Sequence, residues 1–169
     1  CFIIFSCKKK NIEKNEQFSS IAEGYLLLNE GLEWLQIFDI SYINLASLPR
    51  TLKGLILCKL ESCSQDDYYR DYVDFPPNLE LLKITIFCHS KVICPDNLKV
   101  LQIISDFEDT DIDITMPDTL ERLSYFGNNT YLKGLPSHLK TLEITITDLD
   151  FINANIPLTL EELIIKEEG

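Results

Sequence analysis

The sequence of 169 residues predicts a mainly β solenoid with about seven short parallel strands. Three observations predict this class. A short phrase of proline and leucine returns along the chain, each copy continues into alternating apolar and polar residues, and one position of the phrase carries charges of alternating sign. Repeats of this kind stack so that each unit covers the core of its neighbour.

The phrase Pro-x-x-Leu-x-x-Leu occurs six times, and an earlier copy at residues 29–35 lacks the proline. The first leucine of each copy, here called the lead leucine, is Leu32, Leu52, Leu79, Leu98, Leu120, Leu139 or Leu160. Their mean spacing is about 21 residues, which is typical of a short solenoid repeat with one strand per turn.

Each copy is predicted to form a short strand. An apolar residue follows two positions after the second leucine, at Ile37, Leu57, Ile84, Ile103, Tyr125, Ile144 and Ile165. This period of two is typical of a strand with one buried face. Proline keeps the residue before it extended and has no N–H for a sheet ladder, so we expect it at the entrance of each strand.

The position after each lead leucine, here called the rung, gives an independent indication of register, because leucine and proline alone define the repeat. The rungs are Glu33, Lys53, Glu80, Lys99, Glu121, Lys140 and Glu161. Equivalent residues on neighbouring strands lie ~4.7–4.9 Å apart, so each carboxylate would lie between two ammonium groups. The alternation therefore predicts parallel, consecutive strands in register.

These residues resemble the leucine-rich-repeat family, in its short proline-containing bacterial subtype. Residues 120–136 match best, since they follow the L-x-x-L-x-L-x-x-N frame with Asn128 at the place of the family's buried asparagine. The resemblance covers about residues 28–166. It implies strands on a concave face and, because other copies lack the asparagine, an irregular convex side. A weaker similarity to FNIP-type repeats rests on residues 155–157.

The first twenty residues differ from the rest of the chain. Residues 1–5 are apolar, three lysines follow at 8–10, and the segment 1–20 carries +2 against −14 for residues 21–169. Residues 4–7, Ile-Phe-Ser-Cys, resemble a bacterial lipobox. This resemblance implies a signal-peptide remnant at 1–6 and acylation of Cys7, with 7–20 as the lipidated cysteine and flexible tether.

The repeat domain would then span residues 21–169, with truncation at its C-terminus left open. The alternative for residues 1–7 is a disordered terminus or a strand that happens to place cysteine beside serine.

We expect the concave face to bind a protein or peptide, because its outward positions are more apolar than solubility requires. An insertion between the second and third strands adds tyrosines among aspartates, and tyrosine offers contact area at low entropic cost. The alternatives are that the outward positions merely favour strand-forming residues, that a flanking segment covers the face, and that the insertion is a plain solvated loop. The predicted ligand-binding residues are Trp34, Ile56, Leu81, Val100, Ile104, Arg122, Phe126, Tyr68, Tyr69 and Tyr72.

Composition and motifs argue against several other functions. A net charge of −12 does not favour the phosphate backbone of nucleic acid,. The run Asp109-x-Asp111-x-Asp113 lacks the glycine and distal glutamate of a calcium loop. If the domain is exported, Cys63 and Cys88 could form a disulfide, and the alternative is that both are free thiols. We find no catalytic constellation and expect no enzyme activity, cofactor or metal.

The sequence therefore predicts a monomeric, non-enzymatic binding module of the cell envelope, held at the outer membrane or cell surface by a lipid anchor only. Two alternatives stay open. The chain could be the recognition domain of a longer secreted effector with an enzyme domain downstream, or an intracellular FNIP-like scaffold in which Cys7 is an ordinary cysteine.

Overall fold

The computed structural model describes residues 2–7, 12–17, 28, 30–40, 45–60, 73–86, 90–105, 112–127, 134–145 and 156–166. These residues form twelve strands and one short 3-10 helix, with no α-helix among them. The bounds are β1 Phe2–Cys7, β2 Ile12–Gln17, β3 Trp34–Ile40, η2 Leu45–Ser47, β4 Gly54–Leu60, β5 Val73–Asp74, β6 Leu81–Ile86, β7 Ser90–Ile93, β8 Val100–Ser105, β9 Ile112–Thr115, β10 Arg122–Phe126, β11 Thr141–Thr145 and β12 Glu162–Lys166.

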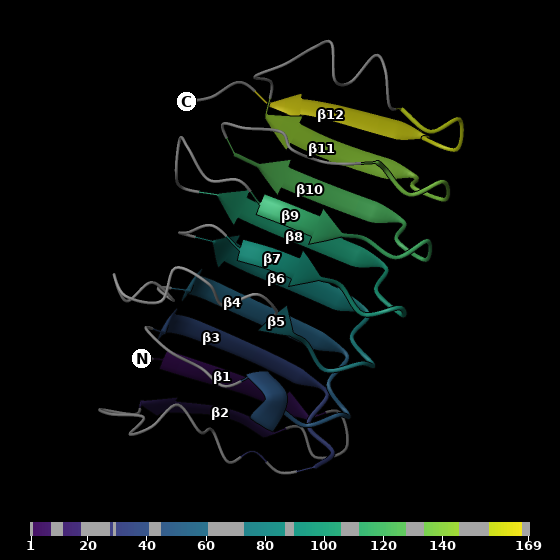
Figure 1. The fold of residues 1–169 in the computed structure, drawn as a ribbon. Helices are drawn as coiled ribbons and strands as arrows, with labels where there is room; N and C mark the ends of the chain where they lie inside the picture. Colours follow the sequence, from purple (N-terminus) through teal and green to yellow (C-terminus); the bar gives the residue numbers. More distant parts are fainter. Residues whose placement is uncertain are drawn as a thin grey trace.

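Seven parallel strands stack in chain order in one sheet (Figure 1), from β3 through β4, β6, β8, β10 and β11 to β12. Equivalent positions of the repeat pair with one another, as in Leu82 with Leu101 and Leu101 with Leu123. The predicted solenoid and its register are therefore confirmed.

A turn precedes the main-sheet strand of each repeat that carries the proline. The lead leucine's N–H donates to the carbonyl of the proline three residues earlier, at N···O distances of 3.1–3.4 Å in all six copies. In the copy with two prolines, Pro76 accepts this bond and Pro77 follows it. The turn brings the chain to the same starting point in every repeat, which fixes where each strand enters the sheet.

The rung positions join the repeats through their backbone. The carbonyl of each rung from Glu33 to Lys140 accepts two N–H groups from the next repeat, those of the next rung and of the residue after it, at 2.7–3.1 Å. This bifurcated bond recurs at every step of the stack, so the register follows from hydrogen bonding as well as from the hydrophobic pattern.

The core is one continuous apolar cluster, made mostly of leucine and isoleucine from the same three positions of successive repeats and completed by residues of the opposite side such as Leu48, Val92 and Ile114. In the fourth proline-containing turn of the chain, for example, Leu120 and Leu123 are fully buried and Tyr125 is nearly so. Each fully buried leucine contributes about 1.5–3 kcal/mol relative to an exposed one. The stack therefore derives its stability from contacts between neighbouring repeats.

The opposite side of the stack is more regular than the predicted irregular convex side. Here β5, β7 and β9 form a second parallel sheet, in which Val92 pairs with Ile114 and both are buried. Each of the three strands ends two residues before the proline of its repeat. The same proline turns that align the main sheet therefore align this one as well.

The N-terminal segment also differs from the unpaired tether that its composition predicts. β1 pairs antiparallel with both β2 and β3, so a hairpin extends the main sheet beyond the first repeat. The open edge of a sheet presents unpaired backbone groups, and a segment rich in isoleucine and phenylalanine favours pairing with it. Processing of residues 1–6 and acylation of Cys7 stay predictions.

Candidate functional site

The face of the main sheet that points away from the leucine core is here called the outer face. Its residues alternate along each strand with the buried ones, and their rows follow from the strand register. The row nearest the strand entrances consists of Trp34, Gly54, Leu81, Val100, Arg122, Thr141 and Glu162.

Seven of the predicted ligand-binding residues lie on this outer face. Those with half-buried side chains are Trp34, Ile56, Leu81, Val100 and Phe126. The other two, Ile104 and Arg122, are exposed. The structure thus brings these seven side chains onto one surface, although their positions in the chain span more than ninety residues.

The remaining predicted sites lie beyond what the structure describes. Tyr68, Tyr69 and Tyr72 fall outside the described residues, as do Cys63, Cys88, Asp109 and Asn128. Cys7 ends β1 opposite Ile12, but its side chain is not described.

Trp34 shapes the first part of the outer face. A Cβ atom on Gly54, its partner in β4, would lie 2.1 Å from Cε3 of the Trp34 ring, so the indole lies directly over the glycine. Only glycine leaves this room on the neighbouring strand. The ring therefore lies against the sheet over Gly54 and adds an apolar surface to the entrance-side row.

The outer face changes character along the stack. From β3 to β8 its entrance-side row is apolar, whereas Arg122, Thr141 and Glu162 continue it on β10–β12. The middle row is mostly polar along the whole stack and consists of Gln36, Ile56, Lys83, Gln102, Ser124, Glu143 and Ile164. In it Ser124 Oγ donates to Glu143 at 2.8 Å, and Lys166 Nζ, from the row beyond, lies 2.6 Å from the same carboxylate.

This polar cluster is held together by its own contacts. Lys166 Nζ also lies 4.9 Å from the centre of the Phe126 ring, within reach of a cation–π attraction. The hydrogen bonds from Lys166 and Ser124 hold the pKa of Glu143 below its usual value. Sequence reasoning missed Ser124, Glu143 and Lys166, because a single charged residue at an outward position is usual for a solvated strand.

Two described cysteines are free thiols. Cys58 is half-buried, and burial is the main cause that raises its pKa, against smaller opposing effects of Gln36 and Lys83. Cys94 is buried in the core, and burial raises its pKa to about 12. Both thiols therefore stay protonated at neutral pH and are poor nucleophiles.

The predicted charge ladder is present along the strand entrances. Each rung lysine forms an ion pair with the preceding glutamate, at 3.0 Å for Lys53–Glu33, 3.2 Å for Lys99–Glu80 and 2.9 Å for Lys140–Glu121. The hydrogen bond to the glutamate is the main cause that raises the pKa of Lys53 and Lys140, and the following glutamates add a weaker coulombic attraction.

A second polar ladder, which sequence reasoning missed, occupies the position before the lead leucine. Its side chains donate to backbone carbonyls of the preceding turn at 2.6–3.3 Å, from Thr51, Asn78, Asn97, Thr119 and Thr159. The recurrence of threonine or asparagine before the lead leucine was the signal for it. Two copies differ: Gly31 has no side chain that could donate, and His138 has Nδ1 3.1 Å from the hydroxyl of Ser137.

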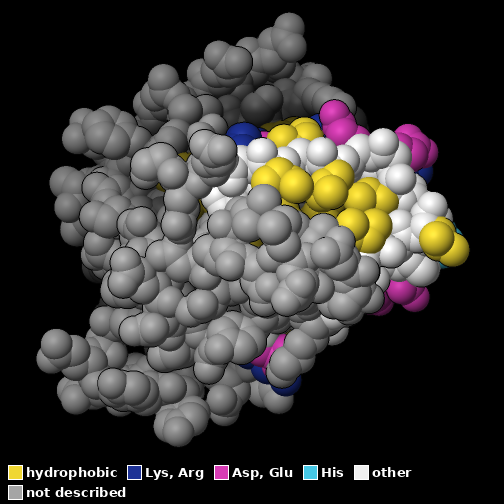
Figure 2. All heavy atoms as spheres, turned by 90° about the horizontal axis from the view of Figure 1, so that it is seen from above, with side chains coloured by type: hydrophobic (Ala, Val, Ile, Leu, Met, Phe, Trp, Pro, Cys, Tyr) yellow, Lys and Arg dark blue, Asp and Glu magenta, His cyan; other side chains and the backbone are white. Residues whose placement is uncertain are grey.

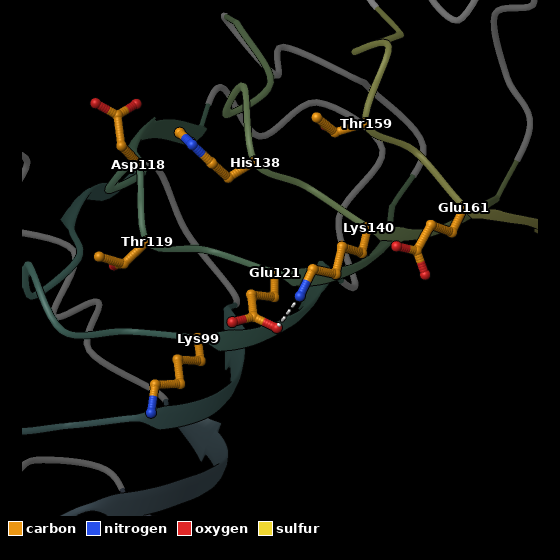
Figure 3. A pocket seen from close by; sticks show the side chains of 8 residues that line it. All are labelled: Lys99, Asp118, Thr119, Glu121, His138, Lys140, Thr159 and Glu161. Carbon is orange, nitrogen blue, oxygen red and sulfur yellow. Dashed lines mark hydrogen bonds and ion pairs between the residues drawn. The ribbon is translucent and has the colours of Figure 1, made fainter.

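A groove of about 630 Å³ lies where these two ladders meet (Figure 3). Asp118, His138 and Thr159 stand on one side of it, and the rungs from Lys99 to Glu161 on the other. Its threonine hydroxyls donate to backbone carbonyls and its Glu121 is paired with Lys140, so much of its polar lining serves the fold.

The described residues contain no group of three histidine, cysteine, aspartate or glutamate side chains that could hold a metal ion. Asp113, from the predicted acidic run, is exposed, with Oδ2 3.6 Å from Lys91 Nζ. In the part of the chain that is described, no helix is long and apolar enough to cross a membrane.

No protein-family model matches this chain, and neither the curated proteins nor the solved structures include a significant match to it. The fold and the two ladders define its class as a parallel-stranded β solenoid built from repeats.

Proposed function

We propose that this solenoid is a non-enzymatic protein-binding module of the leucine-rich-repeat type, and that the outer face from β3 to β8 holds its ligand. One observation carries the proposal: Trp34, Ile56, Leu81, Val100 and Ile104 present half-buried or exposed apolar side chains on a face where polar residues would serve solubility equally well. Apolar side chains that gather on one surface are characteristic of interaction sites.

The leucine-rich-repeat assignment is supported by the burial of its frame. Lead leucine, second leucine and the apolar residue two positions later all point into the core, as in Leu98, Leu101 and Ile103. The outward positions between them take no part in the leucine core, so most of them can vary at lower cost to stability, which is the property that suits such a face to recognition.

The contrast along the outer face suggests the chemistry of the ligand. An extended peptide with apolar side chains would lie on the β3–β8 part, where Trp34 and Leu81 offer contact area. Its polar or charged residues would extend over Arg122 and the Glu143–Lys166 pair. The ligand would gain affinity from the apolar part and orientation from the charged part.

A display library of random peptides tests the proposal without knowledge of the natural ligand. Peptides selected on the wild-type chain are expected to be rich in apolar and aromatic residues, and Val100→Glu should weaken their binding about tenfold or more. Thr115→Glu is the control, because it places the same side chain at an exposed position of β9 in the second sheet, away from the outer face. Equal binding to the wild type and both variants would refute the assignment of this face.

We further propose, from the lipobox-like residues Ile4 to Cys7, that a lipid on Cys7 anchors the module to a membrane of the bacterial envelope. Cleavage before Cys7 would remove most of β1 and open the edge of β3, so the processed form would differ from the paired hairpin. Labelling with palmitate in bacteria, lost in Cys7→Ser, would support the anchor. Unlabelled protein would instead favour an effector domain or an FNIP-like scaffold that uses the same outer face.

A further inference from the structure

The last strand of the main sheet exposes side chains that the other repeats bury. Leu163 and Ile165 are 39% and 43% exposed, whereas their equivalents in β11, Leu142 and Ile144, are 1% and 2% exposed. Leu158, in the preceding turn, is fully exposed. Seen from above the β12 end (Figure 2), the described side chains form an apolar patch with acidic and basic groups at its rim.

β12 is also an edge strand, because β11 is its partner within the described sheet. Its five residues, Glu162-Leu163-Ile164-Ile165-Lys166, have the same pattern of polarity in both directions: a charge, three apolar residues and the opposite charge. Such a strand is complementary to an antiparallel copy of itself.

Symmetry restricts how two copies could pair along this edge. A two-fold axis perpendicular to the sheet makes the strands antiparallel and keeps both outer faces on the same side, so one residue must lie opposite its own copy. With Ile164 at the axis, Glu162 lies opposite Lys166 of the second copy and Leu163 lies opposite Ile165. A shift of the axis to Leu163 or Ile165 removes the match of opposite charges.

We propose that two copies of this chain associate through antiparallel pairing of β12 with β12, centred on Ile164. The pairing satisfies the edge backbone, covers Leu163 and Ile165 of both copies, and forms two Glu162–Lys166 contacts between the copies. Directly opposite charges of unlike sign stabilise an antiparallel pair, and like charges destabilise it.

The positions of the two charged residues fit this role. Lys166 is half exposed, and its ammonium lies on the outer face beside Glu143 of its own copy. Glu162 is exposed on the same face. The association would join the outer faces of two copies side by side, and it would replace the expected monomer.

Sedimentation of the 169-residue chain over a wide range of concentration tests the proposal. The wild-type chain should reach twice its mass of 19.5 kDa. Glu162→Lys and Lys166→Glu should each raise the dissociation constant about tenfold or more, because each places like charges opposite one another twice. Mixing the two variants should restore association, since every contact between them is again of opposite sign.

Two controls separate pairing from folding. Glu143→Gln removes the partner of Lys166 within its own copy and leaves β12 unchanged, so it should associate as the wild type does. Circular dichroism should show that each charge variant keeps its strand content. A wild-type chain that stays monomeric, a dimer that both charge variants leave unchanged, or open-ended growth beyond two copies would each overturn the proposal.

Discussion

The repeats that end in β11 and β12 share one sequence phrase but differ in what surrounds it. Leu142 and Leu163 occupy the same position of that phrase, and so do Ile144 and Ile165, yet only the β11 residues are buried. The alternating pattern determines the direction in which a side chain points. A neighbouring repeat that covers the side chain determines whether it is buried, so burial in this fold depends on pairs of repeats.

The largest effect on stability is expected when equivalent leucines are truncated in the middle and at the end of the stack. Leu101→Ala should lower the free energy of unfolding by about 3–4 kcal/mol, because Leu101 is fully buried and the substitution leaves a cavity,. Leu163→Ala should cost about 1 kcal/mol in dilute solution, because part of its surface is already in water,. Urea denaturation measures both, and equal losses would contradict the comparison.

Gly54→Ala extends the comparison to the outer face of an interior repeat. The new Cβ would overlap the Trp34 ring, so we expect a loss of about 1–3 kcal/mol,. The same substitution in a Trp34→Ala background should cost much less, because the ring is gone. A double-mutant cycle by thermal denaturation measures the coupling, and a cycle without coupling would show that the ring does not lie on the glycine in solution.

The Glu143–Lys166 contact joins the last two repeats, and its contribution should depend on pH. The pKa of Glu143 is lowered by folding from a usual value of 4.5, so the folded state is stabilised above that pH and loses this contribution as the pH falls through the lowered pKa,. Glu143→Gln should therefore show a smaller loss of stability on acidification. Unfolding from about pH 7 to about pH 3 measures the difference, and parallel curves for the two proteins would contradict it.

The smallest effect is expected at the charge ladder. Lys99 lies between Glu80 and Glu121, so Lys99→Glu places three acidic side chains in a row, whereas Lys99→Gln only removes the attraction. Exposed ion pairs contribute roughly 0.2–1 kcal/mol, and salt screens them. We expect Lys99→Glu to be the less stable variant at low salt and the difference to shrink at high salt. Equal stability of the two at low salt would refute the ladder.

Sequence predicted the repeated parts of this molecule well, because several independent residues report on each repeat. The proline sets the turn, Leu98 and its equivalents set the buried face, and the rung charges set the register. The hairpin of β1 and β2 escaped prediction for the opposite reason. It occurs once, and an apolar stretch followed by lysines also suits a targeting segment, so no repeat could decide between the two.

The second sheet and the middle of the outer face were predicted less well. The segments that lead into the prolines vary in length, and strands such as Val73–Asp74 are too short to show an alternation. On the outer face, Trp34 and Ile104 were predicted from their places in the repeat, but the cluster of Ser124, Glu143 and Lys166 depends on three neighbouring repeats at once. Such a cluster becomes recognisable once the strands are placed side by side.

The alternating rungs have a consequence for how such an array can change in length. Deletion or duplication of one repeat would bring two rungs of the same sign together, Glu80 beside Glu121 if the repeat of Lys99 were lost. Deletion or duplication of two adjacent repeats would keep the alternation intact. The rungs therefore impose parity on the array, and a pair of repeats, rather than a single one, is the unit by which it can grow or shrink without electrostatic penalty.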